Sequence, residues 1–305
     1  QRMQWAIGIS LQPGSSTVKV TVRMFNRTDQ THSILYWANV ATHVNDDYQV
    51  IFPPSTQVGT YHAKNQFIHW PIAQGEYLGR DYTGVDVSWW KNHPWHTSIF
   101  AHDLREGFLA GYDHGKEAGT MHVADPNIVT GAKLWEWGKD NTWDSDVLTD
   151  SDGNYAELMA GAYSDNQPDY SWIKPGEMKE AVQIWYPIRD IGGAKSANAD
   201  AVVNLEIIDD GKKARLGFNT TRKLENARVV LRDTEDTLVD ERITIDPAHP
   251  YVSEIDLPEG IVETDLQASL YSADENLLVS YQPVKRDLPE SLPEIVEPPA
   301  SPEKI

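Results

Sequence analysis

The chain has 305 residues and 40% hydrophobic content, which is enough for more than one buried core, so two domains are expected. Its formal net charge of -20 excludes a nucleic-acid partner, because binding a phosphate backbone requires clustered Lys and Arg. No run of about 18 apolar residues exists, so no membrane span is predicted. The absence of cysteine fits a reducing and an oxidising compartment equally, and a periplasmic or secreted location is favoured over a cytoplasmic one.

Apolar and polar residues alternate with a period of two through the first 190 residues. The clearest case is 17–26, where Val18, Val20, Val22 and Met24 share one side of a predicted strand. Similar segments are 5–11, 34–44, 48–52, 107–112, 120–123, 133–137, 155–159 and 180–187. Only 103–106 hints at a helical turn, and 53–88 has no pattern and is expected to be a loop that covers a site or carries function. These features predict an all-β domain, a large antiparallel β-sandwich over 1–190.

Aromatic rings, imidazoles and carboxylates are concentrated between Ser88 and Trp172 without helical periodicity. Indole rings stack on the CH faces of sugars, and carboxylates, amides and imidazoles bond to sugar hydroxyls. The sequence therefore predicts a carbohydrate ligand. Its expected contacts in this region are Trp89, Trp90, Trp95, Lys133, Trp135, Trp137 and Tyr155.

The second half of the chain repeats the alternation without the aromatic residues. A small, polar run over 190–202 marks the domain boundary. Seven strand-like segments follow, at 201–208, 214–219, 227–232, 237–245, 251–257, 267–272 and 278–282, and predict a small immunoglobulin-like β-sandwich over 200–283. Residues 284–305 are rich in Pro and Glu and are predicted to be an extended linker tail.

Three groups of segments carry a family resemblance: Asn26-Arg-Thr28 with Tyr36-Trp-Ala-Asn-Val40, Lys133-Leu-Trp-Glu-Trp-Gly138, and Tyr155-Ala-Glu-Leu158 with Ile173-Lys-Pro-Gly-Glu177. Together they resemble the galactose-mutarotase-like superfamily, and more narrowly its branch of unknown function that is commonly fused to tetratricopeptide repeats. The resemblance spans about residues 2–187 and misses the superfamily's N-terminal strands. It implies a β-supersandwich that binds a pyranose on its concave face, with a C-terminal helical-repeat region as a partner in the full-length chain.

The resemblance also implies a proton-transfer site. Sugar mutarotases use a carboxylate base and a His acid on one sugar, and Glu157 lies at the position similar to the base. The chain departs from the family at the acid, because Trp37-Ala-Asn39 stands where His-Pro-Tyr-Phe is usual. Trp37 and Asn39 are expected to contact the sugar instead. His93 resembles the motif in Asn92-His-Pro-Trp95 but follows much later, and it is a candidate partner of Glu157 together with His96.

Glycoside hydrolysis is an alternative chemistry, since it needs two carboxyls of different pKa. Glu136 lies between Trp135 and Trp137, where desolvation would raise its pKa, and Glu157 would be its partner. In a strand, however, the two Trp rings share one face and Glu136 points to the other. By the same alternation Tyr155 and Glu157 share a face, which is expected to line the cleft.

Less specific interpretations remain open. The protein is either a carbohydrate-active enzyme, a glycosidase or epimerase that uses Glu157, or a non-catalytic sugar-recognition or scaffold module of a larger helical-repeat protein. Trp residues in a β-sandwich commonly pack the core. His93, His96 and His102 with Asp103 match no tight metal-ligand spacing, so neither a metal nor another cofactor is predicted.

Overall fold

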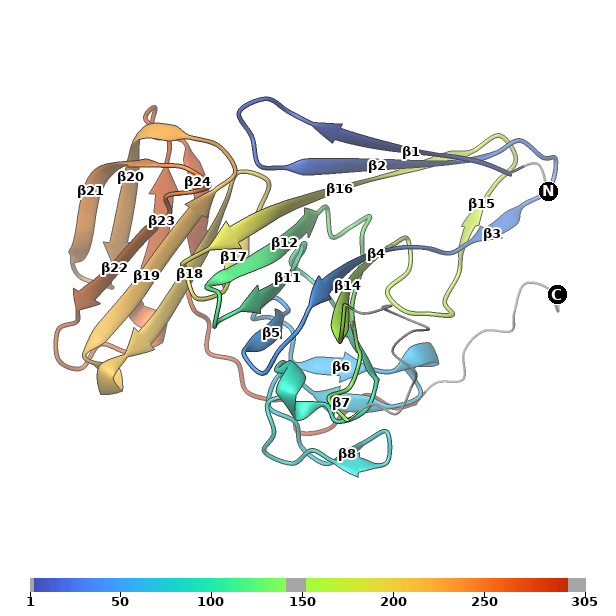
Figure 1. Ribbon diagram of the computed structural model, residues 1–305, viewed down its shortest axis with the longest axis horizontal. Coiled ribbons are helices and arrows are strands. Elements are labelled where there is room, and N and C mark those ends of the chain that lie inside the picture. Colours follow the sequence, from blue (N-terminus) through green and yellow to red (C-terminus); the bar gives the residue numbers. More distant parts are fainter. Residues whose placement is uncertain (1–2, 141–151, 296–305) are drawn as a thin grey trace.

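The computed structural model describes residues 3–140 and 152–295, and Figure 1 shows two β domains. In the first domain, two six-stranded antiparallel sheets pack face to face. The β16 sheet has the order β1 (Met3–Leu11), β2 (Val18–Asn26), β16 (Met178–Arg189), β12 (Ala118–Ala124), β11 (Phe108–Asp113) and β5 (Tyr48–Ile51). The β13 sheet has the order β4 (Tyr36–His43), β14 (Tyr155–Ala162), β13 (Gly131–Glu136), β10 (Thr97–Ala101), β6 (Val58–Thr60) and β7 (Phe67–His69). Two-stranded pairs join β3 (His32–Ile34) to β15 (Ser171–Ile173) and β8 (Glu76–Tyr77) to β9 (Arg80–Asp81).

Strand alternation explains where the core lies. Ile99, Leu134 and Leu158 point from the β13 sheet into the sandwich, where they join Val50 and Leu109 of the β16 sheet in one buried cluster. Because successive side chains alternate across a strand, the residues between them project from the opposite face. That opposite face, the outer face of the β13 sheet, is therefore free to carry polar groups.

The predicted strands with one wet face are confirmed, and two kinds of strand escaped prediction. Val22 and Met24 are buried on β2, as the alternation of 17–26 predicts. Strand β10 does not alternate because all five of its residues are buried. The segment 53–88 is not a bare loop, since it holds β6 to β9, which are too short to show a period. The predicted helical turn at 103–106 is wrong, and the helices of the described residues are short 3-10 turns, at His62–Lys64, Trp90–Asn92, Asp209–Gly211 and Glu263–Asp265.

The second domain is the predicted immunoglobulin-like sandwich. One sheet has the order β17 (Ser196–Ala197), β18 (Ala201–Ile208), β19 (Lys213–Thr220) and β22 (Tyr251–Asp256). The other has the order β21 (Thr237–Ile245), β20 (Leu224–Arg232), β23 (Gln267–Tyr271) and β24 (Leu277–Tyr281). Buried apolar residues from both sheets, such as Leu216 and Val229, form its core.

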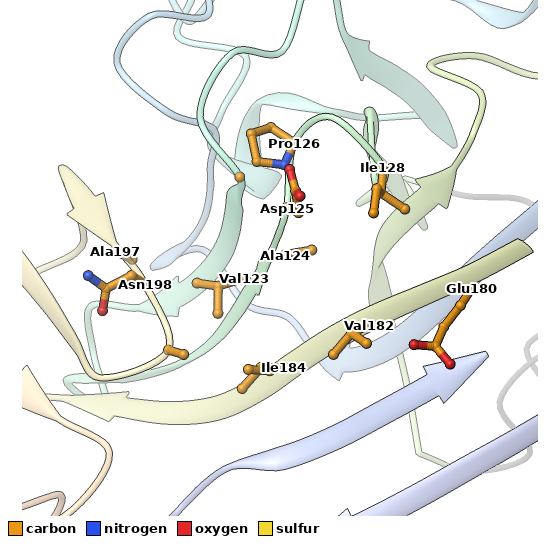
Figure 2. A pocket seen from close by; sticks show the side chains of 12 residues that line it. Val123, Ala124, Asp125, Pro126, Ile128, Glu180, Val182, Ile184, Ala197 and Asn198 are labelled. Atoms are coloured by element: carbon orange, nitrogen blue, oxygen red, sulfur yellow. The ribbon is translucent and has the colours of Figure 1, made fainter. Parts of the chain in front are cut away.

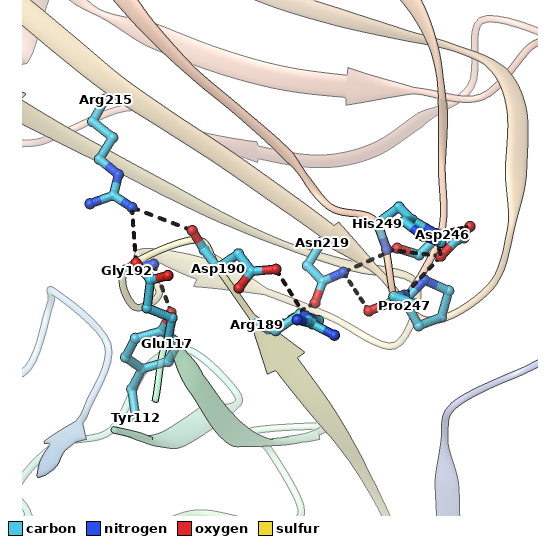
Figure 3. A network of polar contacts seen from close by, with 11 residues as sticks. Tyr112, Glu117, Arg189, Asp190, Gly192, Arg215, Asn219, Asp246, Pro247 and His249 are labelled. Atoms are coloured by element: carbon cyan, nitrogen blue, oxygen red, sulfur yellow. Dashed lines mark hydrogen bonds and ion pairs between the residues drawn. The ribbon is translucent and has the colours of Figure 1, made fainter. Parts of the chain in front are cut away.

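The two domains share a boundary that is packed and hydrogen-bonded. Ile191 and Val202 belong to one buried cluster with residues of β11, β12 and β16. Figure 3 shows the polar part of this junction, in which the Arg189 backbone N–H donates to Oδ1 of Asn219 over 3.1 Å. The first domain is thus anchored to the second at the end of β16.

The tail that follows β24 contacts the first domain. Figure 1 shows the chain leaving the second domain and running back beneath the first. The Gln57 side-chain amide donates to the Asp287 carbonyl oxygen over 2.8 Å, and Nε2 of His69 lies 3.2 Å from the Pro289 carbonyl oxygen. Residues 284–295 have no strand or helix, and the rest of the predicted tail lies outside the described residues.

Candidate functional site

The outer face of the β13 sheet gathers most of the predicted site residues that stay accessible. Trp135 on β13 lies opposite both Glu157 on β14 and Ser98 on β10. Residues opposite each other in antiparallel strands project from the same face, so these three side chains are neighbours. The alternation that places Glu157 and Tyr155 on one side, and Glu136 on the other, is found in the structure.

The Glu157 carboxylate is held in place by two neighbours. Nδ2 of Asn39 on β4 donates to Oε2 over 2.7 Å, and the Tyr155 hydroxyl donates to Oε1 over 3.3 Å. Glu157 is half-buried and Asn39 is exposed. Burial and the nearby Glu157 charge raise the pKa of Tyr155, so the phenol remains a donor at neutral pH. A carboxylate oxygen can accept two hydrogen bonds, so both oxygens of Glu157 have capacity left for ligand hydroxyls.

Lys133 is a buried cation on the same face. Its Nζ donates to Nε2 of His62 over 3.3 Å and to Oε1 of Gln167 over 3.2 Å, and it lies 4.8 Å from the centre of the Phe100 ring. Burial lowers the pKa of Lys133 to about 8, although the Glu157 charge acts to raise it. Burial and the Lys133 charge lower the pKa of His62 to about 4, so the imidazole is neutral and accepts at Nε2.

The Trp37 indole packs against two glycines of the sheet. A Cβ atom at Gly131 or Gly161 would lie 2.4 Å from atoms of the indole. Both positions must therefore be glycine for the ring to pack on the sheet. The Phe100 ring meets the indole edge-on at 5.3 Å between centroids. Trp37 is partly exposed and borders the Lys133 region of the face.

Two hollows lie on this face. The Glu157 hollow, of about 360 Å³, is lined by residues that include Glu157, Tyr155 and Asp152. The Arg80 hollow, of about 340 Å³, is lined by residues that include Arg80 and Trp135. Trp135 of the Arg80 hollow and Glu157 of the other hollow are cross-strand neighbours on this face. Both volumes fall within the range of small-molecule pockets, roughly 300–1,000 Å³.

Glu136 and His93 lie inside the sandwich, not on this face. The Glu136 side chain has 0% exposure, and its Oε2 is 3.4 Å from Nε2 of His93. That His93 nitrogen donates to the Val87 carbonyl oxygen over 2.8 Å. Desolvation raises the pKa of Glu136 well above its ordinary value and lowers that of His93 to about 4. This placement corrects the expectation that either residue partners Glu157, because neither reaches the face on which Glu157 lies.

The predicted tryptophan contacts divide into two groups. Trp90 and Trp137 are buried, and the Trp90 indole N–H donates to the Trp137 carbonyl oxygen over 2.6 Å. Trp89 stacks on His114 at 4.8 Å, beside the edge of the β16 sheet. Trp90 and Trp137 therefore pack the core, which corrects their expected role in sugar contact. Trp89 is half-buried and lies away from the outer face of the β13 sheet, and its expected contact stays a prediction. Trp95 and His96, in contrast, are exposed and line the Arg80 hollow.

Sequence reasoning missed His62, Arg80 and Gln167. His62 and Arg80 belong to the unpatterned segment 53–88, and the length of that segment was the one signal that it serves a site. No spacing in the sequence connects them to Lys133 or Trp135. His62 directly follows β6, a strand of the β13 sheet, and Arg80 lies on β9, and both residues line the Arg80 hollow.

Within 3–140 and 152–295, His, Asp and Glu side chains form no group of three or more that is placed to hold a metal ion. Over the same ranges, helices of the length and apolar character needed to cross a bilayer are absent.

A further hollow lies on the opposite side of the domain. It measures about 580 Å³, and Figure 2 shows Val123 of β12 with Val182 and Ile184 of β16 along it and Glu180 at one end. Its lining is mainly apolar and includes Asn198 near the second domain. None of the residues predicted to bind sugar lines it.

These features define a two-domain, all-β protein with ligand-sized hollows on the outer face of a large sandwich. The chain belongs to the family described as Domain of unknown function (DUF5107), which matches residues 1–188. Residues 196–281 match the family described as YphG-like protein, second domain.

Solved structures of similar fold cover mainly the first domain. A TPR-domain containing protein from Parabacteroides distasonis is 24% identical, with 61% of this chain and 30% of that chain covered and a TM-score of 0.49. A putative aldose 1-epimerase from Klebsiella pneumoniae is 13% identical, with 62% and 47% covered and a TM-score of 0.42. A galactose mutarotase-like protein from Clostridium acetobutylicum is 13% identical, with 62% and 56% covered and a TM-score of 0.39.

The chain thus spans less than two thirds of the length of each of these three proteins. The matched family is a domain of unknown function, and these proteins are similar to this chain in fold. The likeness concerns the fold and says nothing of a ligand or reaction of this chain.

Proposed function

We propose that the protein binds a saccharide on the outer face of the β13 sheet. The observation that carries this proposal is the Glu157 carboxylate, which Asn39 and Tyr155 hold on an accessible sheet face directly beside the Trp135 indole. A pyranose has an apolar CH face and a rim of hydroxyls, so an indole and a fixed carboxylate in adjacent positions match both parts. The superfamily resemblance implies the same class of ligand.

Binding is tested with a glycan array, followed by calorimetry on the glycans that bind. We expect Glu157→Ala to weaken binding about tenfold to 100-fold, because a hydrogen bond to a charged group contributes about 1.5–3 kcal/mol. Trp135→Ala removes the stacking surface and weakens binding as well. Glu235→Ala, at an exposed carboxylate of the second domain, is the matched control and should bind as wild type does. A wild-type protein that binds no glycan, or a Glu157→Ala variant with unchanged affinity, would contradict the proposal.

Proton transfer at the anomeric carbon is a second candidate function. It is favoured by the Lys133 ammonium and the Glu157 carboxylate, which lie on the same face of the β13 sheet and interact electrostatically. The Glu157 carboxylate would take the proton of the anomeric hydroxyl, and the Lys133 ammonium would protonate the ring oxygen as its bond to the anomeric carbon breaks. The open-chain aldehyde then recloses on either face and returns both protons. A Lys pKa of about 8 lies closer to neutral pH than the ordinary value, which suits a general acid.

Anomer exchange in a panel of aldoses, followed by NMR, tests this reaction. Glu157→Gln and Lys133→Met should each slow exchange about 100-fold or more, since positioned acids and bases commonly contribute 10²–10⁴. Glu157→Gln should keep measurable binding, because the amide still offers an acceptor. If wild type speeds exchange in no aldose, the site only recognises its ligand, as expected for a non-catalytic module of a larger helical-repeat protein.

A further inference from the structure

The two hollows on the outer face of the β13 sheet differ in charge. The carboxylates of Glu157 and Asp152 line the Glu157 hollow. Arg80 and His96 line the Arg80 hollow, and the part of its lining that the structure describes includes neither Asp nor Glu. Because the whole chain carries a net charge of -20, an acid-free hollow with an arginine is a local reversal of the surface charge. The reversal selects for an anion.

Arg80 keeps its charge available for a ligand. It lies on β9, and its guanidinium is held 5.3 Å from the centre of the Tyr82 ring. A cation–π contact orients a guanidinium without neutralising it. Among the ion pairs of the described residues, none involves Arg80, which is exposed. The planar fork of a guanidinium pairs with a carboxylate through two parallel hydrogen bonds.

The walls of the Arg80 hollow are aromatic. Trp95 is 56% exposed, and Tyr61 and Trp135 line the same hollow. His62 also lines it, and the Lys133 ammonium lies 3.3 Å behind the His62 ring nitrogen, which adds positive charge to that wall. Exposed rings around a cation suit a ligand with apolar faces and one negative group.

We infer that the Arg80 hollow is a subsite for an acidic sugar, a hexuronic acid unit whose carboxylate pairs with Arg80. The unit would be joined to the sugar bound beside Glu157, with Trp135 between them. This inference rests on the proposed function, because it needs a saccharide on the outer face. A sulfate or phosphate ester would also bring negative charge to the guanidinium fork, so a sulfated glycan is included in the test.

Matched glycans test the subsite. A galacturonate trisaccharide, the galactose trisaccharide of the same linkage and its 6-sulfated form are titrated against the whole chain by calorimetry. We expect the galacturonate to bind at least tenfold more tightly than the neutral glycan, and the difference to shrink with added salt. Arg80→Gln should abolish the difference, because it removes the charge that distinguishes the acidic glycan from the neutral one. Arg80→Lys, which keeps the charge but not the fork, should retain only part of it.

Arg232→Gln, at an exposed arginine of the second domain, is the control and should keep the full preference. Equal affinity of wild type for the acidic and neutral glycans would overturn the inference and leave the proposed function intact. A preference for the sulfated form would overturn the hexuronate assignment. If a wider array of neutral and acidic glycans also gives no binding, both the inference and the proposed function fail.

Discussion

Glu136 on β13 and Glu157 on β14 are close neighbours in one sheet, yet their carboxyls project from opposite faces. Glu136 pairs in register with Ala156 and points into the core, whereas Glu157 pairs with Trp135 and points to the outer face. Among the described residues, neither oxygen of Glu136 has a hydrogen-bond partner, but both oxygens of Glu157 have one. Glutamate therefore occurs once as a buried core residue, at Glu136, and once as an accessible residue of the candidate site, at Glu157.

Glu136→Gln should change the pH dependence of stability and leave glycan binding unchanged. The pKa of Glu136 is raised in the folded state, so its contribution to stability is complete below the unfolded pKa and is lost as pH rises. Glutamine cannot ionise, so relative to wild type the free energy of unfolding of the variant should improve between pH 4.5 and pH 8. Urea denaturation at both pH values measures this, and Glu157→Gln provides the comparison. Equal pH dependence in Glu136→Gln and wild type would show that the carboxyl is ionised in the fold.

For His122 we predict that stability falls as pH falls, which is the opposite of the trend for Glu136. It is buried against the Trp185 ring at 4.5 Å between centroids, and burial lowers its pKa from 6.5 to about 3. The unfolded chain takes up a proton first as pH falls, so stability drops by about 1.4 kcal/mol for each pH unit between these two values. His122→Phe removes the proton uptake, and its loss of stability between pH 7 and pH 5 should be about 2 kcal/mol smaller than that of wild type. Denaturation curves whose midpoints shift in parallel would contradict a neutral, buried His122.

The packing of Trp37 against Gly131 and Gly161 gives a steric prediction. In Gly161→Ala the new Cβ would lie 2.4 Å from the indole, so the ring must move. Overpacking of this kind costs roughly 1–3 kcal/mol, and the moved indole should shift the tryptophan emission. Gly8→Ala is the matched control, because its nearest atom lies 4.0 Å away. A Gly161→Ala variant as stable as Gly8→Ala would mean that the sheet absorbs the methyl group without moving Trp37.

The sequence predicted the strands that have one dry and one wet face. Segments 201–208 and 237–245 match β18 and β21 residue for residue. Alternation cannot mark β10, which is buried on both sides, or β6 to β9, which are two or three residues long. Those strands become stable through their pairing partners, and pairing over long distances leaves no local pattern.

The same limit applies to the candidate site. Period-two reasoning placed Glu157 with Tyr155 and set Glu136 on the other side, because side-chain direction in a strand is local information. It did not find His62 or Arg80, whose positions depend on how a segment without pattern folds over the β13 sheet. The many aromatic residues in 88–172 led to the prediction of a class of ligand. They did not separate Trp90, which is buried, from Trp95, which is exposed.

We predict that the side-chain amide of Asn219 couples the unfolding of the two domains. Its Oδ1 accepts from the backbone N–H of Arg189, at the end of β16, and its Nδ2 donates to the carbonyl oxygens of Asp246 and Pro247 at 3.4 Å (Figure 3). Asn219 is buried at 1% exposure, so in Asn219→Ala these groups lose their partner in a place that water does not reach. The cost should be about 1–3 kcal/mol for the unpaired groups, and because they lie at the junction, the thermal transition should broaden or divide into two.

Differential scanning calorimetry measures this effect. Asn276→Ala, at an exposed position of the second domain, is the matched control and should unfold as wild type does. If Asn219→Ala unfolds in one transition at the wild-type temperature, the coupling lies instead in the apolar contact of Ile191 and Val202 with the first domain. Val202→Ala, which opens a cavity there, should then produce the divided transition that Asn219→Ala does not.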